Sequence, residues 1–419
     1  MTTQPPVVVP SLSDFETALA NVRQVAIETP TLHSKFLSEL VGQQVFLKCE
    51  NLQRTGAYKV RGAFNRMSHL TAVEKKKGVI AASAGNHSQG VALAAKKLGI
   101  KATVYMPIGA SLPKVEATRN YGARVVQQGG TFAECLKAAQ EEAKNTGAIF
   151  IPPFDHIDVV LGQGTVGLEI LQQHPDVSTI VVAIGGGGLA AGVAVAAKLA
   201  AAAQGRKIKV IGVQSEHSAA YPASLRAGKV TEIQTTPTIA DGIAVSKPGR
   251  VPFELIKKYV DKVVTVSEND IAKAILVLLE RAKQVVEPAG AVAVAALMSG
   301  KAKAKAKGKT VAILSGGNMD PLLLQRVIRH GLSTSDRYTN FSVMLPDRPG
   351  QLALTAEVIA GAHANVIEVL HTRHGNGLQI SEVELNLSVE TSGHKHRMEV
   401  VKALEKAGLR PKLQPSRED

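Results

Sequence analysis

Short apolar runs alternate along most of the chain with alanine-rich stretches, and this alternation restricts the folds open to the sequence. Residues 78–82, 102–106 and 179–184 are β-type runs, and helical stretches such as 131–145 and 189–203 separate runs of this kind. Several runs are apolar without interruption, as in strands that have both sheet faces covered by helices. The pattern therefore predicts an α/β protein with largely parallel sheets.

The same pattern predicts further elements and two defined helix starts. Ser267 with Asp270, and Ser13 with Glu16, have the spacing of a capping box, in which two side chains bond the free N–H groups of a helix start. We also expect a helix at 112–121 and strands at 44–48, 124–127, 207–214 and 310–315.

Near residue 335 the pattern changes to one of alternating strands and amphipathic helices. The order βαββαβ predicts a ferredoxin-like unit. Its expected elements are strand 338–345, helix 351–362, strands 365–373 and 378–390, helix 394–407 and a last strand after Leu409. We place a linker at 333–336, which gives a first domain of residues 1–333 and a second of 338–419.

Length and composition indicate a globular protein of two or three domains. The chain has 419 residues, of which 45% are hydrophobic and 20% charged. No apolar run approaches the ~18–20 residues that span a bilayer, and the first residues lack the basic region of a secretory signal. Cys49 and Cys135 have no metal or disulfide spacing. We expect a cytoplasmic protein with reduced thiols and no membrane partner.

The net charge of +14 does not by itself indicate a nucleic-acid partner. Acidic and basic residues nearly balance in the C-terminal part, and in the first 333 residues the surplus is scattered apart from the run at 301–309. Aromatic residues make up only 4% and tryptophan is absent, which leaves few platforms for stacking bases. We expect no nucleic-acid binding.

Lys59 stands in an unusual setting, the stretch NLQRTGAYKVRGAF at 51–64. A glycine precedes it by three residues and small apolar residues follow it, whereas most lysines lie on solvated faces. One interpretation is an ordinary turn into a helix. The other is an amine in a partly dry place, where it loses its proton more easily and attacks a carbonyl.

Three further loops follow predicted strands and precede helices or turns. The loop at 83–87 (SAGNH) presents a helix start, which suits a carboxylate. The four glycines at 185–188 allow the backbone to approach a phosphate closely. The third loop, 315–318, carries a hydroxyl and two glycines. Each alone can be purely structural, but together they lie where α/β sheets bind ligands.

A dinucleotide site is the alternative interpretation of the glycine run. Gly185, Gly187 and Ala190 fit the pattern G-x-G-x-x-A, and Glu216 ends the next strand. That glutamate lies further along than the about 20 positions typical of the motif. A nicotinamide-dependent dehydrogenase also leaves Lys59 and the loop at 83–87 unexplained.

Five segments together resemble the fold-type II pyridoxal-phosphate enzymes, the tryptophan synthase β-like group. The resemblance runs over about residues 10–330, is closest to the threonine and serine dehydratases, and implies two open, mostly parallel sheet subdomains, the smaller at about 48–152. The C-terminal stretches FSVMLPDRPGQL and ANVIEV resemble one ACT regulatory domain. The five segments are KCENLQRTGAYKVRGA, SAGNHSQGVA, GGGGL, EPAGA and LSGGN.

The resemblance implies roles for several residues around a pyridoxal 5′-phosphate cofactor. Lys59 would hold the cofactor covalently and act as the base at the substrate α-carbon. Tyr58, at a position where the family usually has phenylalanine, would stack on the ring. Ser83, Asn86 and His87 would surround the substrate carboxylate, with Asn86 also contacting the cofactor's phenolic oxygen.

The remaining cofactor contacts follow from the same resemblance. Ser315 would face the pyridine nitrogen, and the phosphate would be held by the backbone N–H groups of Gly185, Gly186, Gly187, Gly188 and Leu189. A serine cannot keep the ring nitrogen fully protonated as an aspartate would, which suits loss of the β-hydroxyl over transamination.

Two positions depart from the racemases among these relatives. Ala84 replaces a serine that serves the opposite face of the α-carbon, so dehydration without efficient racemisation is expected. Glu216 matches one residue of the family's cation site, but Pro222 stands where racemases have an aspartate. A monovalent or divalent cation at Glu216 is left open, and Asp241 is expected near the site without an assigned role.

The resulting expectation is a lyase that converts L-threonine to 2-oxobutanoate and ammonia, with L-serine as a weaker substrate. The ACT resemblance implies isoleucine biosynthesis with allosteric feedback and an isoleucine or valine effector near Pro349, Gly350 and Asn365. A homodimer and a homotetramer both fit, since most oligomers are symmetric. The alternatives are a serine dehydratase or racemase-like enzyme, a nicotinamide-dependent dehydrogenase and a non-catalytic amino-acid sensor.

Overall fold

The computed structural model describes residues 6–303, 308–334, 336–373 and 378–414. The chain divides into two compact units, Met1–Leu323 and Leu324–Asp419. Nothing in the described residues forms a helix long and apolar enough to cross a bilayer. Cys49 and Cys135 are both buried and free.

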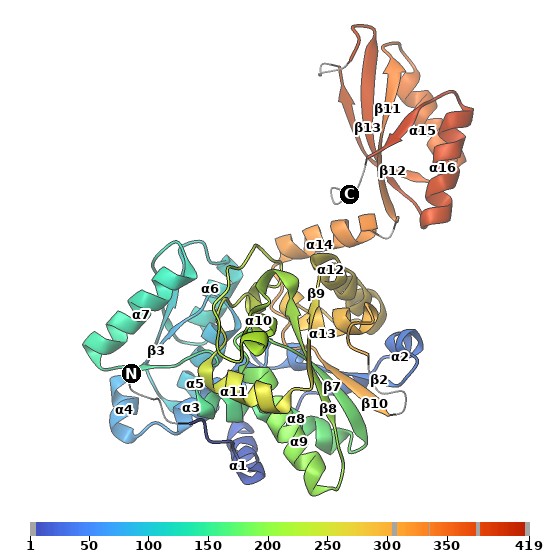
Figure 1. The fold of residues 1–419 in the computed structure, drawn as a ribbon. Helices are drawn as coiled ribbons and strands as arrows, with labels where there is room; N and C mark the ends of the chain where they lie inside the picture. Colours follow the sequence, from blue (N-terminus) through green and yellow to red (C-terminus); the bar gives the residue numbers. More distant parts are fainter. Residues whose placement is uncertain (1–5, 304–307, 335, 374–377, 415–419) are drawn as a thin grey trace. The chain divides into compact units, whose positions relative to one another are not determined.

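The first unit is built around a six-stranded sheet with the order β1-β2-β10-β7-β8-β9. All neighbours are parallel except β1, which pairs antiparallel with β2. Helices cover both faces, with α9 and α13 both packed on β7 (Figure 1). The strands are β1 (Thr31–His33), β2 (Val45–Lys48), β7 (Val177–Ala183), β8 (Lys209–Ser215), β9 (Lys262–Val266) and β10 (Lys309–Ile313).

The second sheet of this unit is smaller, and its strands lie between β2 and β7 in the sequence. The order β5-β4-β3-β6 is parallel throughout. Alternate residues of β3 pack in opposite hydrophobic clusters, Val79 with α5 residues and Ile80 with α7 residues, which explains its unbroken apolar sequence. The strands are β3 (Val79–Ala82), β4 (Ala102–Met106), β5 (Arg124–Gln127) and β6 (Ile149–Phe150).

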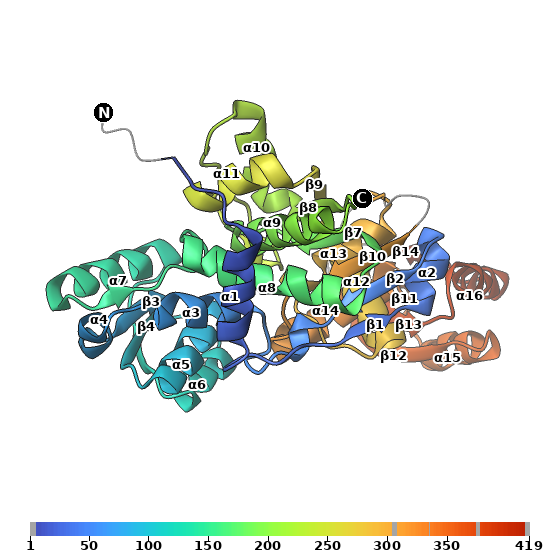
Figure 2. The ribbon, with the colours of Figure 1, turned by 90° about the horizontal axis from the view of Figure 1, so that it is seen from below.

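Helices around the two sheets connect their strands. From below, α1 crosses α8, which it contacts (Figure 2). The first group is α1 (Leu12–Val22), α2 (Lys35–Val41), α3 (Lys59–Ser68), α4 (Ala72–Lys77), α5 (Asn86–Leu98), α6 (Leu112–Asn120), α7 (Phe132–Thr146) and α8 (Ile157–Gln173). The second is α9 (Gly188–Ala203), α10 (Ala220–Ala227), α11 (Arg250–Tyr259), α12 (Glu268–Val277) and α13 (Pro288–Met298). The boundary between the two units falls within α14 (Pro321–Thr334). Short turns of helix are η1 (Glu50–Leu52), η2 (Glu216–Ser218), η3 (Asp241–Ile243) and η4 (Leu278–Ala282).

The second unit has the predicted order βαββαβ. Its four strands form an antiparallel sheet with the order β12-β13-β11-β14. Inward residues such as Phe341, Leu385 and Leu404 build a separate core. The elements are β11 (Tyr338–Pro346), α15 (Gln351–Gly361), β12 (Asn365–Thr372), β13 (Glu382–Glu390), α16 (His394–Lys406) and β14 (Pro411–Leu413).

The two predicted capping boxes have different outcomes. Ser267 and Asp270 form the box that begins α12, which confirms that prediction. The prediction for Ser13 and Glu16 is wrong, because α1 is capped two residues earlier by Ser11 with Asp14. Both pairs have the same spacing. The helix begins at the pair of Ser11 and Asp14, because Ser11 has the extended backbone of an N-cap residue. Of the strand expected at 378–390, only Glu382–Glu390 is a strand, because the sheet pairing with β11 starts at Glu382.

Candidate active site

A cavity of about 420 Å³ lies in the first unit, where loops that follow β3, β7 and β10 meet the start of α3. A volume of this size is typical of small-molecule sites. All residues predicted to contact cofactor or substrate line it. They are Tyr58, Lys59, Ser83, Asn86, His87, Gly185, Gly186, Gly187, Gly188, Leu189 and Ser315.

Lys59 is the first residue of α3 and points its amine into this cavity. The amine Nζ donates a hydrogen bond to the carbonyl of Pro153 at 3.1 Å and lies 5.3 Å from the centre of the Tyr58 ring. Burial lowers the pKa of Lys59 to about 8, although the charge of Glu287 opposes the shift. The side chain is only half-buried by surface area because the cavity is open, but protein surrounds the amine. At pH 7 about a tenth of this amine is therefore uncharged, far more than for an ordinary lysine.

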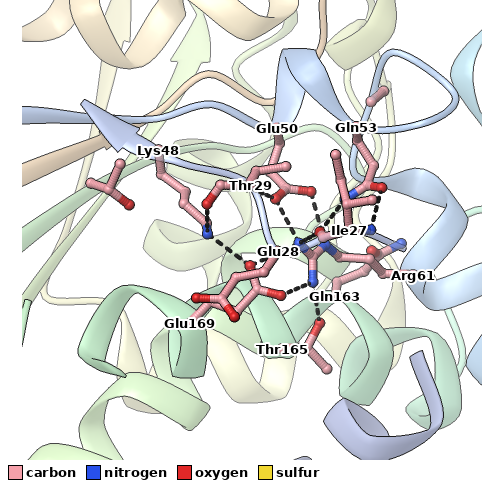
Figure 3. Close-up of polar contacts among 12 residues, drawn as sticks. Ile27, Glu28, Thr29, Lys48, Glu50, Gln53, Arg61, Gln163, Thr165 and Glu169 are labelled. Carbon is pink, nitrogen blue, oxygen red and sulfur yellow. Dashed lines mark hydrogen bonds and ion pairs between the residues drawn. The ribbon is translucent and has the colours of Figure 1, made fainter. Parts of the chain in front are cut away.

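A buried ion-pair network holds the first turn of α3, which carries Arg61 (Figure 3). We use this name for Lys48, Glu50, Arg61 and Glu169, whose side chains are at most 3% exposed. Arg61 contacts Glu50 at 2.8 Å and Glu169 at 2.6 Å, and Lys48 contacts Glu169 at 2.7 Å. Thr165 also accepts from the Arg61 guanidinium. The network thus joins η1, α3 and α8. Its Arg61 lies on α3, two residues after Lys59.

The loop after β3 brings Ser83, Asn86 and His87 to the cavity. Gly85 precedes α5 without a side-chain cap, so the first N–H groups of the helix are open to a ligand. Ser83 Oγ accepts from the N–H of Gly85 at 3.1 Å. His87 is 4% exposed, and its Nε2 lies 2.9 Å from the carbonyl of Ile151. Burial, with a contribution from Lys59, lowers the pKa of His87 to about 3, so this imidazole is neutral.

The glycine run at 185–188 leads directly into α9. Gly187 has a φ of +102° and a side chain there would overlap the Tyr221 hydroxyl. A side chain on Gly186 would overlap the Phe154 ring. Glycine is therefore required by the surrounding packing, and the backbone forms a cradle at the N-terminus of a long helix.

Sequence reasoning missed two charged residues that also line the cavity, Glu287 and Lys114. Asp241, which was expected near the site without an assigned role, lines it as well. Lys114 and Asp241 lie 3.3 Å apart. Glu287 is 4% exposed and accepts from Asn86 Nδ2 at 2.5 Å. Burial, reinforced by Asp241, raises the pKa of Glu287 to about 7 against the effects of Lys114, Asn86 and Lys59. The available signal was a lone acid in the apolar segment EPAGA.

The residues predicted to bind a cation or an effector lie elsewhere. Glu216 is on η2, and its side chain is 45% exposed. Across the described ranges, no group of three or more His, Cys, Asp or Glu side chains could hold a metal ion. In the second unit, Pro349 and Gly350 line a cavity of about 250 Å³, whereas Asn365 does not line it.

The cavity residues fit pyridoxal 5′-phosphate by their chemistry. The glycine cradle at the start of α9 suits a phosphate, because added side chains would fill it. Lys59 offers an amine with a pKa of about 8 for covalent attachment. Ser315, 4% exposed at the end of β10, offers a neutral hydroxyl for the ring nitrogen, and Tyr58 an aromatic ring.

Comparison with known proteins decides the family. Residues 22–316 match the family described as pyridoxal-phosphate dependent enzyme. The chain belongs to this family. The interpretation as a pyridoxal-phosphate-dependent enzyme is thereby confirmed, and the matched segment includes both Lys59 and the glycine run.

Curated relatives and solved structures agree with this assignment. An L-threonine ammonia-lyase of Thermotoga maritima is 47% identical over 94% of this chain and 97% of its own length. One from Geobacter sulfurreducens is 45% identical over 92% and 95%. The solved threonine deaminase isoform 2 of Solanum lycopersicum has a TM-score of 0.72 and 38% identity, and covers 77% of this chain and 94% of its own. Maize serine racemase has the same TM-score at 34% identity, with 78% and 99% covered.

Proposed function

We propose that this protein converts L-threonine to 2-oxobutanoate and ammonia, with L-serine as a weaker substrate. The observation that carries the proposal is the amine of Lys59, with its pKa lowered to about 8, in one cavity with the glycine cradle and Ser315. The names of the relatives that span nearly the whole chain support threonine as the substrate.

Bound pyridoxal phosphate supplies an electron sink for cleavage of the bond between hydrogen and the substrate α-carbon. Lys59 in its uncharged form accepts that proton. Ser83 and the open first turn of α5 bind the substrate carboxylate. Asn86 fixes the ring through its amide, and the Ser315 hydroxyl faces the ring nitrogen without protonating it fully.

The reaction conserves atoms as a loss of water followed by hydrolysis. The substrate gives up its α-hydrogen and its β-hydroxyl as water, and the released enamine tautomerises to an imine. Water then hydrolyses the imine to 2-oxobutanoate and ammonia. Ala84, which lines the cavity, carries no group able to return a proton from the opposite face. We therefore propose dehydration rather than racemisation as the main outcome.

Visible absorbance and ketoacid release test this proposal. The purified protein should bind pyridoxal phosphate with a band that changes when L-threonine is added, and 2-oxobutanoate should accumulate. A band without ketoacid would direct the search to L-serine and other hydroxy-amino acids. No band after incubation with pyridoxal phosphate would reject the proposal.

We further propose that the second unit is an ACT domain that binds an amino-acid effector. Its cavity of about 250 Å³ includes Pro349, Gly350 and Arg373, whose guanidinium lies 3.5 Å from Asp347. A paired guanidinium and carboxylate suit the two charges of a free amino acid. Isoleucine or valine should raise the melting temperature of the protein and lower its activity.

The effector response also separates two physiological roles. Feedback by isoleucine would support a role in isoleucine biosynthesis, which we propose. The Escherichia coli relative is named a catabolic L-threonine dehydratase and is 49% identical over 68% of this chain. Equal activity with and without each branched-chain amino acid would favour a catabolic role instead.

We propose a cytoplasmic homo-oligomer as the working form. Strand β12 lies at the edge of the second unit's sheet, and its Ile367, Val369 and Leu370 are 39–62% exposed. An exposed apolar edge strand is suited to pairing with a second copy. Sedimentation should show a dimer or tetramer, and Leu370→Lys should shift it toward smaller species.

A further inference from the structure

Glu287 is a buried acid in the active-site cavity to which the proposed mechanism gives no task. Its carboxylate Oε1 accepts from Asn86 Nδ2 at 2.5 Å, and its own N–H donates to the carbonyl of Gly316 at 3.0 Å. A side chain on Gly316 would overlap Oε1, so glycine makes room for this carboxyl group. The position of Glu287 is therefore defined by backbone on one side and by Asn86 on the other.

Asn86 is held at its other end by a second amide. Asn318 Nδ2 donates to Asn86 Oδ1 at 2.8 Å and to the carbonyl of Thr55 at 2.8 Å. A side chain on Gly56 would overlap Asn318 Oδ1, so this contact also depends on a glycine. The carbonyl of Thr55 only accepts, and it therefore determines which end of the Asn318 amide is the nitrogen.

The hydrogen bonds run in one direction from Asn318 to Glu287. Because Asn318 donates to Asn86 Oδ1, the Asn86 nitrogen must face Glu287, and an ionised carboxylate can only accept from it. One N–H of Asn86 Nδ2 is used in this bond. Its second N–H has no acceptor among the described residues and belongs to a side chain that lines the cavity.

We infer that Glu287 is a positioning residue: together with Asn318 it orients the Asn86 amide so that an N–H is offered to the phenolic oxygen of the cofactor. This inference rests on the proposed function, because it needs pyridoxal phosphate in the cavity. An N–H donor stabilises the anionic form of that oxygen. Glu287 acts through Asn86 and does not itself need to touch the reacting atoms.

The ionisation of Glu287 makes this orientation depend on pH. The groups that face Glu287 are Asp241, which raises its pKa, Lys114 and Lys59, which lower it, and Tyr58. Burial is the largest effect, and the pKa is about 7. When pH falls through this value the carboxyl group gains a proton and loses its charge, so it accepts the Asn86 N–H less strongly and Asn318 alone then orients the amide.

The test compares binding of two cofactors to the cofactor-free protein. Glu287→Gln keeps the size of the side chain but removes its acceptor-only character. Its dissociation constant for pyridoxal phosphate at pH 8 should rise about tenfold, the effect of one hydrogen bond to a charged group. The constant for pyridoxal phosphate methylated on the phenolic oxygen should not change. In the unmodified protein the preference for pyridoxal phosphate over the methylated cofactor should fall below pH 7, and in Glu287→Gln this fall should be absent; the comparison of the two cofactors cancels the titration of Lys59, which affects both.

Two further variants test the positioning role of Glu287 if Glu287→Gln does not fold. Asn318→Asp replaces the donor with an acceptor and should cause the same selective loss. Asp241→Asn removes a charge that raises the pKa of Glu287 and should move the pH midpoint lower. Equal loss for both cofactors, or no loss at any pH, in a variant whose parent binds pyridoxal phosphate and releases ketoacid would overturn this inference alone. A parent that binds no pyridoxal phosphate would overturn the proposed function and this inference together.

Discussion

The buried ion-pair network and the cavity contain similar charged side chains, but they differ in how completely the charges are paired. In the network, Arg61 is matched by two carboxylates and Glu169 by two cations. In the cavity, Lys59 has a neutral carbonyl as its hydrogen-bond acceptor, and Glu287 has the amide of Asn86 as its donor.

The pKa values follow this difference. Burial favours the neutral form of Glu50, but Arg61 and Lys48 outweigh it, and the pKa of Glu50 is lowered. In the cavity burial dominates, which lowers the pKa of Lys59 to about 8 and raises that of Glu287 to about 7. The fully paired charges of the network keep their side chains in place and stay ionised. The incompletely paired Lys59 and Glu287 can gain or lose protons near neutral pH.

The largest difference between the two regions is expected when the Lys59 amine is removed from the cavity. Lys59→Ala should abolish covalent cofactor attachment and lower kcat by about 10³-fold or more, because the base is lost. In the cofactor-free proteins the urea midpoint should remain close to that of the parent, since no charge loses its partner. Absorbance and ketoacid release measure the effect, and normal turnover by this variant would disprove the role of Lys59.

Removing Arg61, one of the two cations of the network, should lower the stability of the fold rather than the turnover. Arg61→Met leaves Glu50 and Glu169 buried beside an apolar side chain, which should cost about 3–5 kcal/mol of unfolding free energy. The matched control is Lys198→Met, whose ion pair with Asp261 has side chains 25% and 35% exposed. That control should cost less than about 1 kcal/mol in urea denaturation. Similar losses in both variants would contradict the structural role of the network.

The pH dependence of stability sharpens the contrast. Between pH 8 and 10.5 the folded, cofactor-free protein has lost the Lys59 proton while the unfolded chain still holds it. The contribution of Lys59 to the unfolding free energy should therefore rise with pH in this window, by about 3 kcal/mol. Lys59→Met should lack that rise. Parallel stability curves for the two proteins would show that burial does not shift this pKa.

A substitution in the glycine cradle shows how far cofactor binding depends on backbone geometry rather than on charge. Gly187→Ala would place a methyl group against Tyr221 at a positive φ, and should weaken pyridoxal phosphate binding about tenfold. Gly205→Ala is the matched control, since Gly205 has a φ of +68° but open space around it. It should lower stability by about 1 kcal/mol without changing cofactor affinity. Equal cofactor affinity in the two variants would argue against the cradle.

The smallest effect is expected at the ring that faces the amine. Tyr58→Phe keeps the aromatic face and should change kcat/KM by less than about twofold, whereas Tyr58→Ala should lose about tenfold through lost stacking. A large effect of Tyr58→Phe would show that the hydroxyl takes part in the reaction.

Most of the fold could be predicted from local sequence pattern. The stretches at 102–106 and 124–127 are strands with those ends, and Ser267 with Asp270 caps α12 as predicted. Where two pairs had the same spacing, as at Ser11 and Ser13, pattern chose the wrong one because both hydroxyls fit the rule equally. The loops at 83–87 and 185–188 were found because glycine and small polar residues after a strand are themselves a local signal.

The sequence by itself determined the α/β class, the βαββαβ order of the second unit and the family of the first. Periodicity and short motifs depend only on residues that lie close together in the sequence. Only the tertiary structure decided that Glu287 faces Asn86 and that Arg61 meets Glu169, pairs separated by 201 and 108 positions. It also decided that β2 lies beside β10. Burial and charge proximity set a pKa, and both depend on distant segments that pack together, so an acid in EPAGA has no distinctive chemistry until the fold surrounds it.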